Sequence, residues 1–100
     1  MKIVWSPLSI ERIQEISEYI SNDSPGEALN WVERIFDYVS KLKSFPQLGR
    51  RVPEIKRNNY RELIFGNYRI IYRADEKQII ILTVRHFKQI LPINEIKIKK

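Results

Sequence analysis

The feature that most constrains this chain is a helix-start signal at Ser24-Pro25-Gly26-Glu27. In such a capping box, the serine and the glutamate three residues later satisfy exposed backbone N–H groups, and proline suits the first helical position. Apolar residues then recur at helical spacing: Ala28, Val32, Ile35, Val39 and Leu42. The pattern predicts an amphipathic helix that continues to Phe45-Pro46, where proline disfavours further helix.

A second amphipathic segment lies directly before this helix. Ser6-Pro7 again places a serine cap before a proline. Its apolar positions are Leu8, Ile10, Ile13, Ile16, Tyr19 and Ile20. Because only the polar turn Ser21-Asn22-Asp23 separates the two helices, we predict an αα-hairpin.

The second half of the chain reads as strands. Residues 60–65 and 68–74 flank Gly66-Asn67, a two-residue hairpin turn, and residues 78–86 follow the polar turn Asp75-Glu76-Lys77. Ile3-Val4-Trp5 reads as a first strand, and residues 47–59 as an irregular loop. The predicted class is therefore α+β, with an N-terminal strand and an αα-hairpin packed on an antiparallel sheet, in one domain over residues 1–100. Residues 90–100 fit a short strand, a helix or a flexible basic tail.

Tight turns fix which strand residues share a face. One face carries Leu63, Phe65, Tyr68, Ile70, Tyr72, Ile79 and Ile81, with Arg61 and Arg85 toward one end; as the more apolar face, it is assigned to the hairpin. The other carries Glu62, Arg69, Arg73 and His86 among apolar residues, and is the candidate working surface. A single β-bulge would invert part of this assignment.

Composition narrows the function. The net charge of +6 and the pI of about 9.7 favour anionic partners. Arg50, Arg51, Lys56 and Arg57 concentrate charge in the loop and suit a phosphate backbone, although a solvated loop fits the pattern equally. Without cysteine, disulfides and thiolate metal sites are excluded. No phosphate loop, dinucleotide fingerprint or zinc spacing occurs, so we expect no cofactor or metal. The absence of cysteine also fits a cytoplasmic protein, and no apolar run approaches the length of a transmembrane helix.

One histidine offers a candidate for proton transfer. His86 is the sole histidine, and histidine is the side chain whose ordinary pKa lies nearest neutrality. Arg69 and Arg73, placed on the same face, would stabilise charge on a phosphate. The alternative is that both arginines are cross-strand partners of Glu62.

Four stretches together resemble the RelE/ParE superfamily of toxins from toxin–antitoxin pairs. They are Val4-Trp5-Ser6-Pro7; residues 16–25; Phe45-Pro46-Gln47-Leu48-Gly49-Arg50 with Pro53-Glu54; and Tyr60-Arg61-Glu62-Leu63 through residues 68–72 to Val84-Arg85-His86. The resemblance extends from Ile3 to about His86. It implies the same hairpin-on-sheet fold, and an acidic antitoxin that wraps and silences the toxin in a hetero-oligomer.

The superfamily divides by target. RelE-like and YoeB-like members cut messenger RNA on the ribosome, whereas ParE-like members poison DNA gyrase. By resemblance to the nucleases, Arg69 corresponds to a phosphate-binding arginine, His86 to the catalytic histidine and Glu54 to the general base. However, Phe87 stands where those enzymes tend to have tyrosine.

The long capped hairpin and Tyr60-Arg61-Glu62-Leu63 look more like the ParE-like and plasmid-stabilisation groups. The expected function is therefore a growth-inhibiting, ParE-like toxin that poisons gyrase. A ribosome-dependent mRNA endoribonuclease and a non-toxic basic nucleic-acid-binding domain are the alternatives. The residues expected to contact the target are Arg50, Arg51, Lys56, Arg57, Arg61, Arg73 and Arg85.

Overall fold

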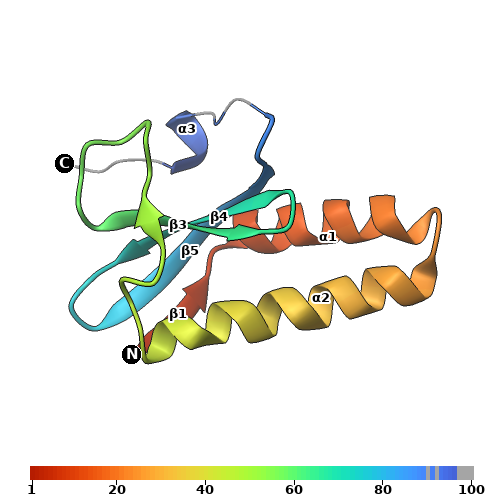
Figure 1. Cartoon of the computed structure of the whole chain (residues 1–100), viewed down its shortest axis with the longest axis horizontal. Coiled ribbons are helices and arrows are strands. Elements are labelled where there is room, and N and C mark those ends of the chain that lie inside the picture. The colour runs from red at the N-terminus through yellow and green to blue at the C-terminus, as the bar shows by residue number, and fades with distance from the viewer. Residues whose placement is uncertain (90, 92, 97–100) are drawn as a thin grey trace.

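The computed structural model describes residues 1–89, 91 and 93–96. The elements follow the order β1 (Lys2–Trp5), α1 (Pro7–Ser21), α2 (Pro25–Ser40), the 3-10 turn η1 (Lys41–Lys43), β2 (Arg50–Arg51), β3 (Tyr60–Phe65), β4 (Tyr68–Ala74), β5 (Gln78–His86) and α3 (Ile93–Ile96). The α1–α2 hairpin lies on one side of the sheet, and α3 lies on the other (Figure 1). The architecture is the predicted α+β arrangement.

Both predicted serine caps form. The Ser6 hydroxyl accepts a hydrogen bond from the backbone N–H of Ser9 at 3.0 Å, and the Ser24 hydroxyl accepts one from Glu27 at 3.2 Å. A proline occupies the first turn of each helix, as expected. The second helix ends at Ser40, earlier than predicted, and η1 continues the chain toward Phe45.

The sheet has five strands in the order β1-β5-β4-β3-β2. The β3–β4 hairpin has the predicted register, with Phe65 opposite Tyr68, and Gly66 adopts the positive φ of 57° that this turn requires. The N-terminal strand pairs with β5 in parallel, whereas the other pairings are antiparallel. The edge strand β2 lies within the predicted loop and was missed, because two residues are too short to show periodicity.

The helix-covered face of the sheet carries the main core. Ile13 and Ile35 of the hairpin pack on it, and Ile35 is fully buried. The buried strand residues of this face are Leu63, Ile70, Tyr72, Ile79, Ile81 and Val84. All but Val84 were assigned to this face from the sequence, because alternation with a two-residue turn leaves a single consistent register.

A β-bulge overturns the face assignment for the end of β5 and leaves that of β3 and β4 as predicted. The β4–β5 register shifts between Ile71 and Tyr72, so that Ile70 lies opposite Val84 rather than opposite Thr83. One extra residue on β5 exchanges the faces of every residue beyond it. His86 therefore lies opposite Tyr68, on the helix-covered face, and Arg85 lies opposite Arg69. The prediction that His86 shares a face with Arg69 is wrong.

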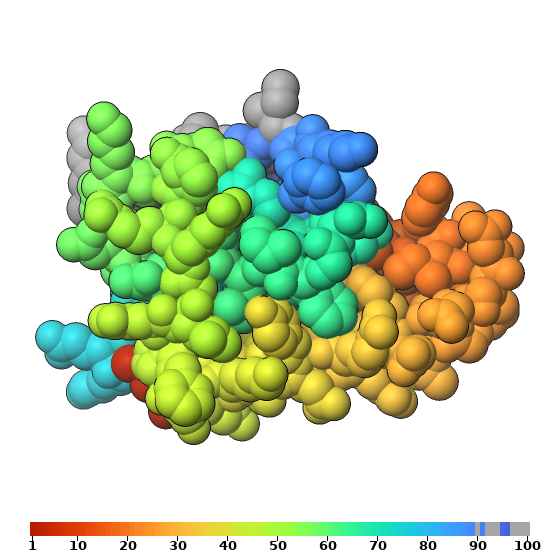
Figure 2. All heavy atoms as spheres, viewed as in Figure 1, coloured from red at the N-terminus to blue at the C-terminus, as the bar shows by residue number. Residues whose placement is uncertain are grey.

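The outer face of the sheet, opposite the hairpin, is covered rather than open. A smaller cluster of Val52, Ile55, Tyr60, Ile71, Leu91 and Ile96 is buried there. It joins the segment before β3 and the chain around α3 to the strands. The segment between α2 and β3 spreads beside the β3–β4 hairpin in the space-filling view (Figure 2). The expected open working surface is thus largely buried.

Candidate target-binding surface and the charged network beneath it

Arg69 stands at the centre of a buried charge network on the outer face. Its Nε donates to Glu62 at 2.7 Å, and its Nη1 and Nη2 donate to the two carboxylate oxygens of Glu54 at 2.9 and 2.8 Å. The Arg69 side chain is 8% exposed, and that of Glu62 is fully buried. Each nitrogen of the guanidinium therefore already holds a carboxylate.

The electrostatics of this network reinforce the pairing. The hydrogen bonds that Arg69 donates to Glu54 raise the pKa of Arg69 although burial opposes the shift, and Glu62 adds to the increase. The hydrogen bond from Arg69 lowers the pKa of Glu54 and outweighs the effect of burial. Glu54 is thereby held as a carboxylate, the form in which it pairs best with Arg69.

A basic edge, which we define as Arg50, Arg51 and Arg61, forms where β2 pairs with β3. Arg51 lies opposite Arg61 in this pairing. Arg50 donates its Nε to the buried Glu62 carboxylate, and Arg61 donates Nη1 to the carbonyl of Gly49 at 2.9 Å. One N–H donor of Arg50 and one of Arg61 are therefore held by the fold, while the Arg50 side chain remains 64% exposed. Such anchoring lowers the entropy lost when the remaining N–H groups bind a partner.

Tyr72 fixes the chain that leads into the basic edge. Its hydroxyl donates to the carbonyl of Pro46 at 2.8 Å and accepts the backbone N–H of Gly49 at 2.9 Å. Burial raises the pKa of the Tyr72 hydroxyl, so it remains protonated and able to donate. The sequence placed Tyr72 in the core but did not indicate this role.

The other expected contact residues are dispersed. Lys56 and Arg57 are exposed in the segment between β2 and β3. Arg73 pairs with Asp75 at 3.3 Å rather than with Glu62. Arg85 donates to Glu95 at 3.0 Å. The structure thus gathers three of the seven expected residues into the basic edge.

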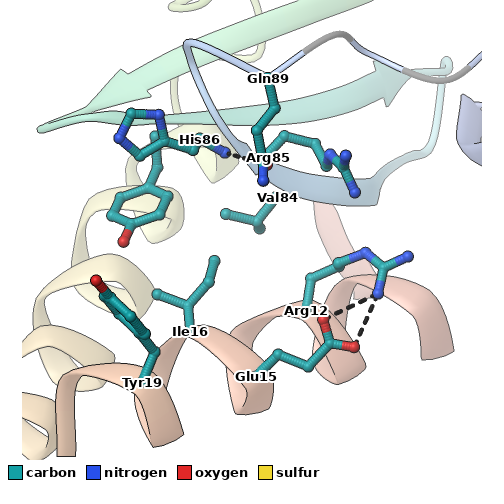
Figure 3. Close-up of a pocket in the computed structure, with 9 residues that line it drawn as sticks. Arg12, Glu15, Ile16, Tyr19, Val84, Arg85, His86 and Gln89 are labelled. Carbon is teal, nitrogen blue, oxygen red and sulfur yellow. Dashed lines mark hydrogen bonds and ion pairs between the residues drawn. The ribbon is translucent and has the colours of Figure 1, made fainter.

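His86 borders a separate cavity of about 350 Å³ between α1 and the end of β5. Its ring lies 5.6 Å from that of Tyr68 and 5.3 Å from that of Phe87. In Figure 3, Tyr19 of α1 and His86 of β5 border the cavity from opposite elements. Because Arg69 and Glu54 lie on the other face of the sheet, the three ribonuclease candidates do not converge on one site.

Two structural absences apply to the described part of the chain. Residues 1–89, 91 and 93–96 contain no group of three or more His, Cys, Asp or Glu side chains able to hold a metal ion. Within the same residues, no helix has the length and apolar character needed to cross a membrane.

Comparison with known proteins identifies the class. The sequence profile described as ParE toxin of type II toxin-antitoxin system, parDE, matches residues 3–91. The chain therefore belongs to the ParE toxin family of type II toxin–antitoxin systems. It is 37% identical over 93 residues to "Putative toxin Y4kP" of Sinorhizobium fredii, covering 91% of this chain and 93% of that protein.

Solved structures share the fold. A chain of the chromosomal ParDE TA system from P. aeruginosa has a TM-score of 0.72 at 22% identity, covering 86% of this chain and 95% of that one. The YoeB dimer from Staphylococcus aureus has a TM-score of 0.58 at 17% identity, over 86% and 95% of the two chains. The predicted superfamily and fold are confirmed.

Proposed function

We propose that this toxin inhibits growth by binding DNA gyrase through the basic edge, without cleaving RNA. The observation that carries the proposal is the saturation of Arg69. A ribonuclease reading needs Arg69, Glu54 and His86 around one phosphate, yet Arg69 holds two carboxylates and His86 lies on the opposite face. Freeing Arg69 would leave the fully buried Glu62 with one fewer partner, which is costly in a low-dielectric interior.

The basic edge suits a surface-binding toxin. Arg50 and Arg61 are held from behind by Glu62 and Gly49, so part of their ordering cost is met within the fold. Arginine also binds carboxylates and phosphates through paired N–H groups. An acidic protein surface or a DNA backbone held by gyrase offers the matching oxygens.

An acidic antitoxin is the second proposed partner. The net charge of +6 favours association with an acidic chain, and opposite charges speed the encounter. Tyr19, Leu29 and Phe45 leave large apolar surfaces exposed, at 73%, 64% and 64%. An antitoxin that binds over these side chains would remove their apolar surface from water.

The direct test is gyrase-driven DNA supercoiling in the presence of the purified toxin. We expect wild-type protein to inhibit supercoiling and to leave ribosome-bound message intact. Arg50→Ala/Arg61→Ala should weaken inhibition at least about tenfold, since about 1.4 kcal/mol of lost binding suffices. Lys77→Ala removes one charge from an exposed turn elsewhere and serves as the control.

Two outcomes would contradict the proposal. Message cleavage without gyrase inhibition would favour the ribosome-dependent endoribonuclease. Failure of the folded protein to arrest growth or to inhibit either target would favour the basic nucleic-acid-binding domain.

A further inference from the structure

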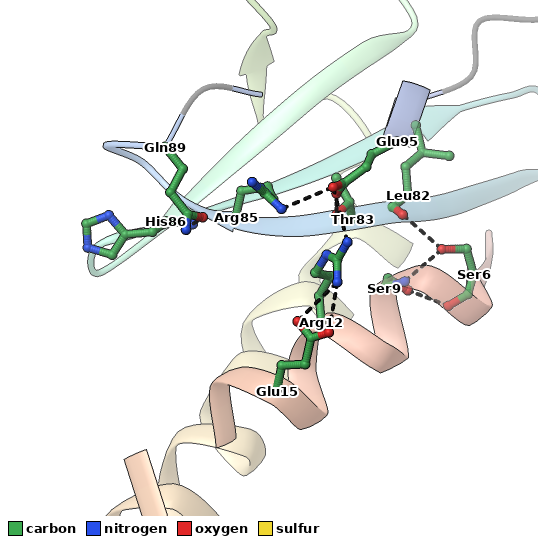
Figure 4. Close-up of polar contacts among 10 residues, drawn as sticks. All are labelled: Ser6, Ser9, Arg12, Glu15, Leu82, Thr83, Arg85, His86, Gln89 and Glu95. Atoms are coloured by element: carbon green, nitrogen blue, oxygen red, sulfur yellow. Dashed lines mark hydrogen bonds and ion pairs between the residues drawn. The ribbon is translucent and has the colours of Figure 1, made fainter. Parts of the chain in front are cut away.

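A carboxylate is enclosed by donors where α1, β5 and α3 meet (Figure 4). Glu95 of α3 accepts hydrogen bonds from Arg12 Nη2 at 3.2 Å, Thr83 Oγ1 at 2.9 Å and Arg85 Nη1 at 3.0 Å. Its side chain is 11% exposed, and Thr83 is fully buried. We call Arg12, Thr83 and Arg85 the donor cluster.

The electrostatic balance favours an anion at this position. Burial pushes the pKa of Glu95 upward, but hydrogen bonds from Arg12 and Thr83 and the charge of Arg85 outweigh it and lower the pKa. The two guanidiniums belong to α1 and β5, which pack together independently of α3. The donor cluster is therefore built by the body of the fold, and Glu95 is brought to it by a separate short segment.

Arg12 also donates Nη1 to Glu15 at 2.9 and 3.0 Å, yet the donor cluster has more hydrogen-bonding capacity than Glu15 and Glu95 use together. The Nε atoms of both Arg12 and Arg85 are buried without an acceptor among the described residues. A buried donor left without a partner is unfavourable, and an acceptor oxygen from water, an ion or another molecule would satisfy it.

The segment that supplies Glu95 is suited to displacement. The helix α3 spans four residues, about one turn, and isolated short helices have little stability of their own. Ile96 of the same helix is buried with Leu91 in the outer-face cluster. The cavity bordered by Ile16, Tyr19 and Val84 adjoins the donor cluster through Arg12 and Arg85. An incoming chain thus has an apolar recess next to the arginines.

The geometry points to a carboxylate-binding site at Arg12, Thr83 and Arg85, which the chain fills with its own Glu95. An acidic segment of a partner protein takes this site by displacing α3, placing a carboxylate between the arginines and an apolar side chain in the adjoining cavity. The chain's own segment is the template for this partner, since it joins the carboxylate of Glu95 to the apolar Ile96. The inference goes beyond the proposed gyrase contact and does not depend on it.

The experiment uses a peptide with the sequence of residues 91–96, Leu-Pro-Ile-Asn-Glu-Ile, and the full-length protein. Glu95→Ala/Ile96→Ser removes the carboxylate from the donor cluster and the apolar side chain of Ile96 from the outer-face cluster, and so loosens the internal segment. We expect titration calorimetry to show at least about tenfold tighter peptide binding to this variant than to wild type, in which the tethered segment competes at high effective concentration. The same peptide with glutamine in place of glutamate should lose binding to the variant.

A triple variant, Arg85→Ala/Glu95→Ala/Ile96→Ser, removes one arginine of the donor cluster and should abolish the binding. Circular dichroism identifies variants that are folded, and Glu95→Gln, which keeps the side-chain shape, replaces the double variant if that one unfolds. Equal peptide affinity for wild type and the loosened variant would overturn the inference, as would no binding to either. Stabilisation of the loosened variant by inorganic phosphate without peptide binding would also overturn it, because the site would then accept an anion of another class.

Discussion

The two faces of the sheet are stabilised in different ways. The helix-covered face buries aliphatic and aromatic side chains from six elements in one continuous core. The outer face has a smaller apolar cluster beside a network in which Glu54, Glu62 and Arg69 are joined by short ion pairs. Apolar packing is proportional to buried area and has no preferred direction, whereas an ion-pair network depends on the position of each atom. The first face thus supports the fold, and the second can additionally position the basic edge.

The comparison also distinguishes the arginine that stabilises the interior from the arginines that lie on the surface. Arg69 is buried and fully paired, while Arg50, tied to the same Glu62 carboxylate, remains exposed. A single buried glutamate therefore connects an arginine of the interior with an arginine of the basic edge. Residue type alone does not distinguish these two roles; burial does.

The largest expected effect is the loss of Glu62, which tests the network. Glu62→Ala leaves the buried guanidinium of Arg69 without one of its two carboxylates, and removing one partner of a buried pair costs about 3–5 kcal/mol. Urea unfolding measures the loss. The double variant Glu62→Leu/Arg69→Met replaces the pair with apolar groups and should recover much of it. Equal destabilisation by both variants would mean that the network acts through shape rather than charge.

Truncation on the helix-covered face should have a comparable but non-electrostatic effect. Ile35→Ala leaves a cavity at a fully buried position, at a cost of about 2–5 kcal/mol. Chemical unfolding at low and high salt distinguishes the two faces, because a cavity penalty should not change with salt. The exposed Leu29→Ala is the matched control and should change stability by less than about 0.5 kcal/mol.

Gly49→Ala tests the close packing of the backbone at Gly49, next to the basic edge, against the sheet. An added Cβ would lie 2.6 Å from the Glu62 carbonyl oxygen and 2.7 Å from the Tyr72 ring. Relief of this overlap should cost about 1–3 kcal/mol by thermal unfolding and shift Arg50. Gly26→Ala meets nothing within 4 Å in the first turn of α2, so it should be neutral or stabilising. Similar behaviour of the two variants would contradict the close packing at Gly49.

Acid should weaken the outer face by a smaller amount. Glu54 has a lowered pKa in the folded chain, so its contribution is present above the unfolded value of about 4.3 and is lost as pH falls through the folded pKa. Because Glu54 is 36% exposed, the contribution should stay below about 1 kcal/mol. Glu54→Gln should therefore flatten the stability profile below about pH 4.5. An unchanged profile would mean that ionised Glu54 does not contribute to the stability of the folded chain.

The sequence predicted most elements because their signals are local. The serine–proline starts located α1 and α2, and the Gly66-Asn67 turn fixed the β3–β4 register. The bulge on β5 could not be located, because it inserts a residue within an unbroken apolar run that reads the same in either register. Because of that single insertion, His86 and Arg85 each lie on the other face of the sheet from the one predicted for them.

The candidate site was predictable only in part. The charges of Arg50, Arg51 and Arg61 were visible, and so was a possible pairing of Arg69 with Glu62. The burial of Arg69 and Glu62 depends on the segment that carries Val52 and Ile55, and the sequence of this segment has no periodic pattern. The link between Glu95 and α1 joins residues 83 positions apart, beyond the reach of any local signal.

The most direct test of the proposed mechanism is growth arrest by His86→Gln, measured beside DNA supercoiling by gyrase. Glutamine keeps a polar side chain but removes the titratable ring, so a mechanism based on proton transfer would lose about 10²–10⁴ in rate. We predict that induced His86→Gln protein still arrests growth and inhibits supercoiling like wild type, whereas Arg50→Ala/Arg61→Ala inhibits supercoiling at least about tenfold more weakly and arrests growth less. A folded His86→Gln protein that no longer arrests growth, together with wild-type protein that cleaves ribosome-bound message, would contradict the account.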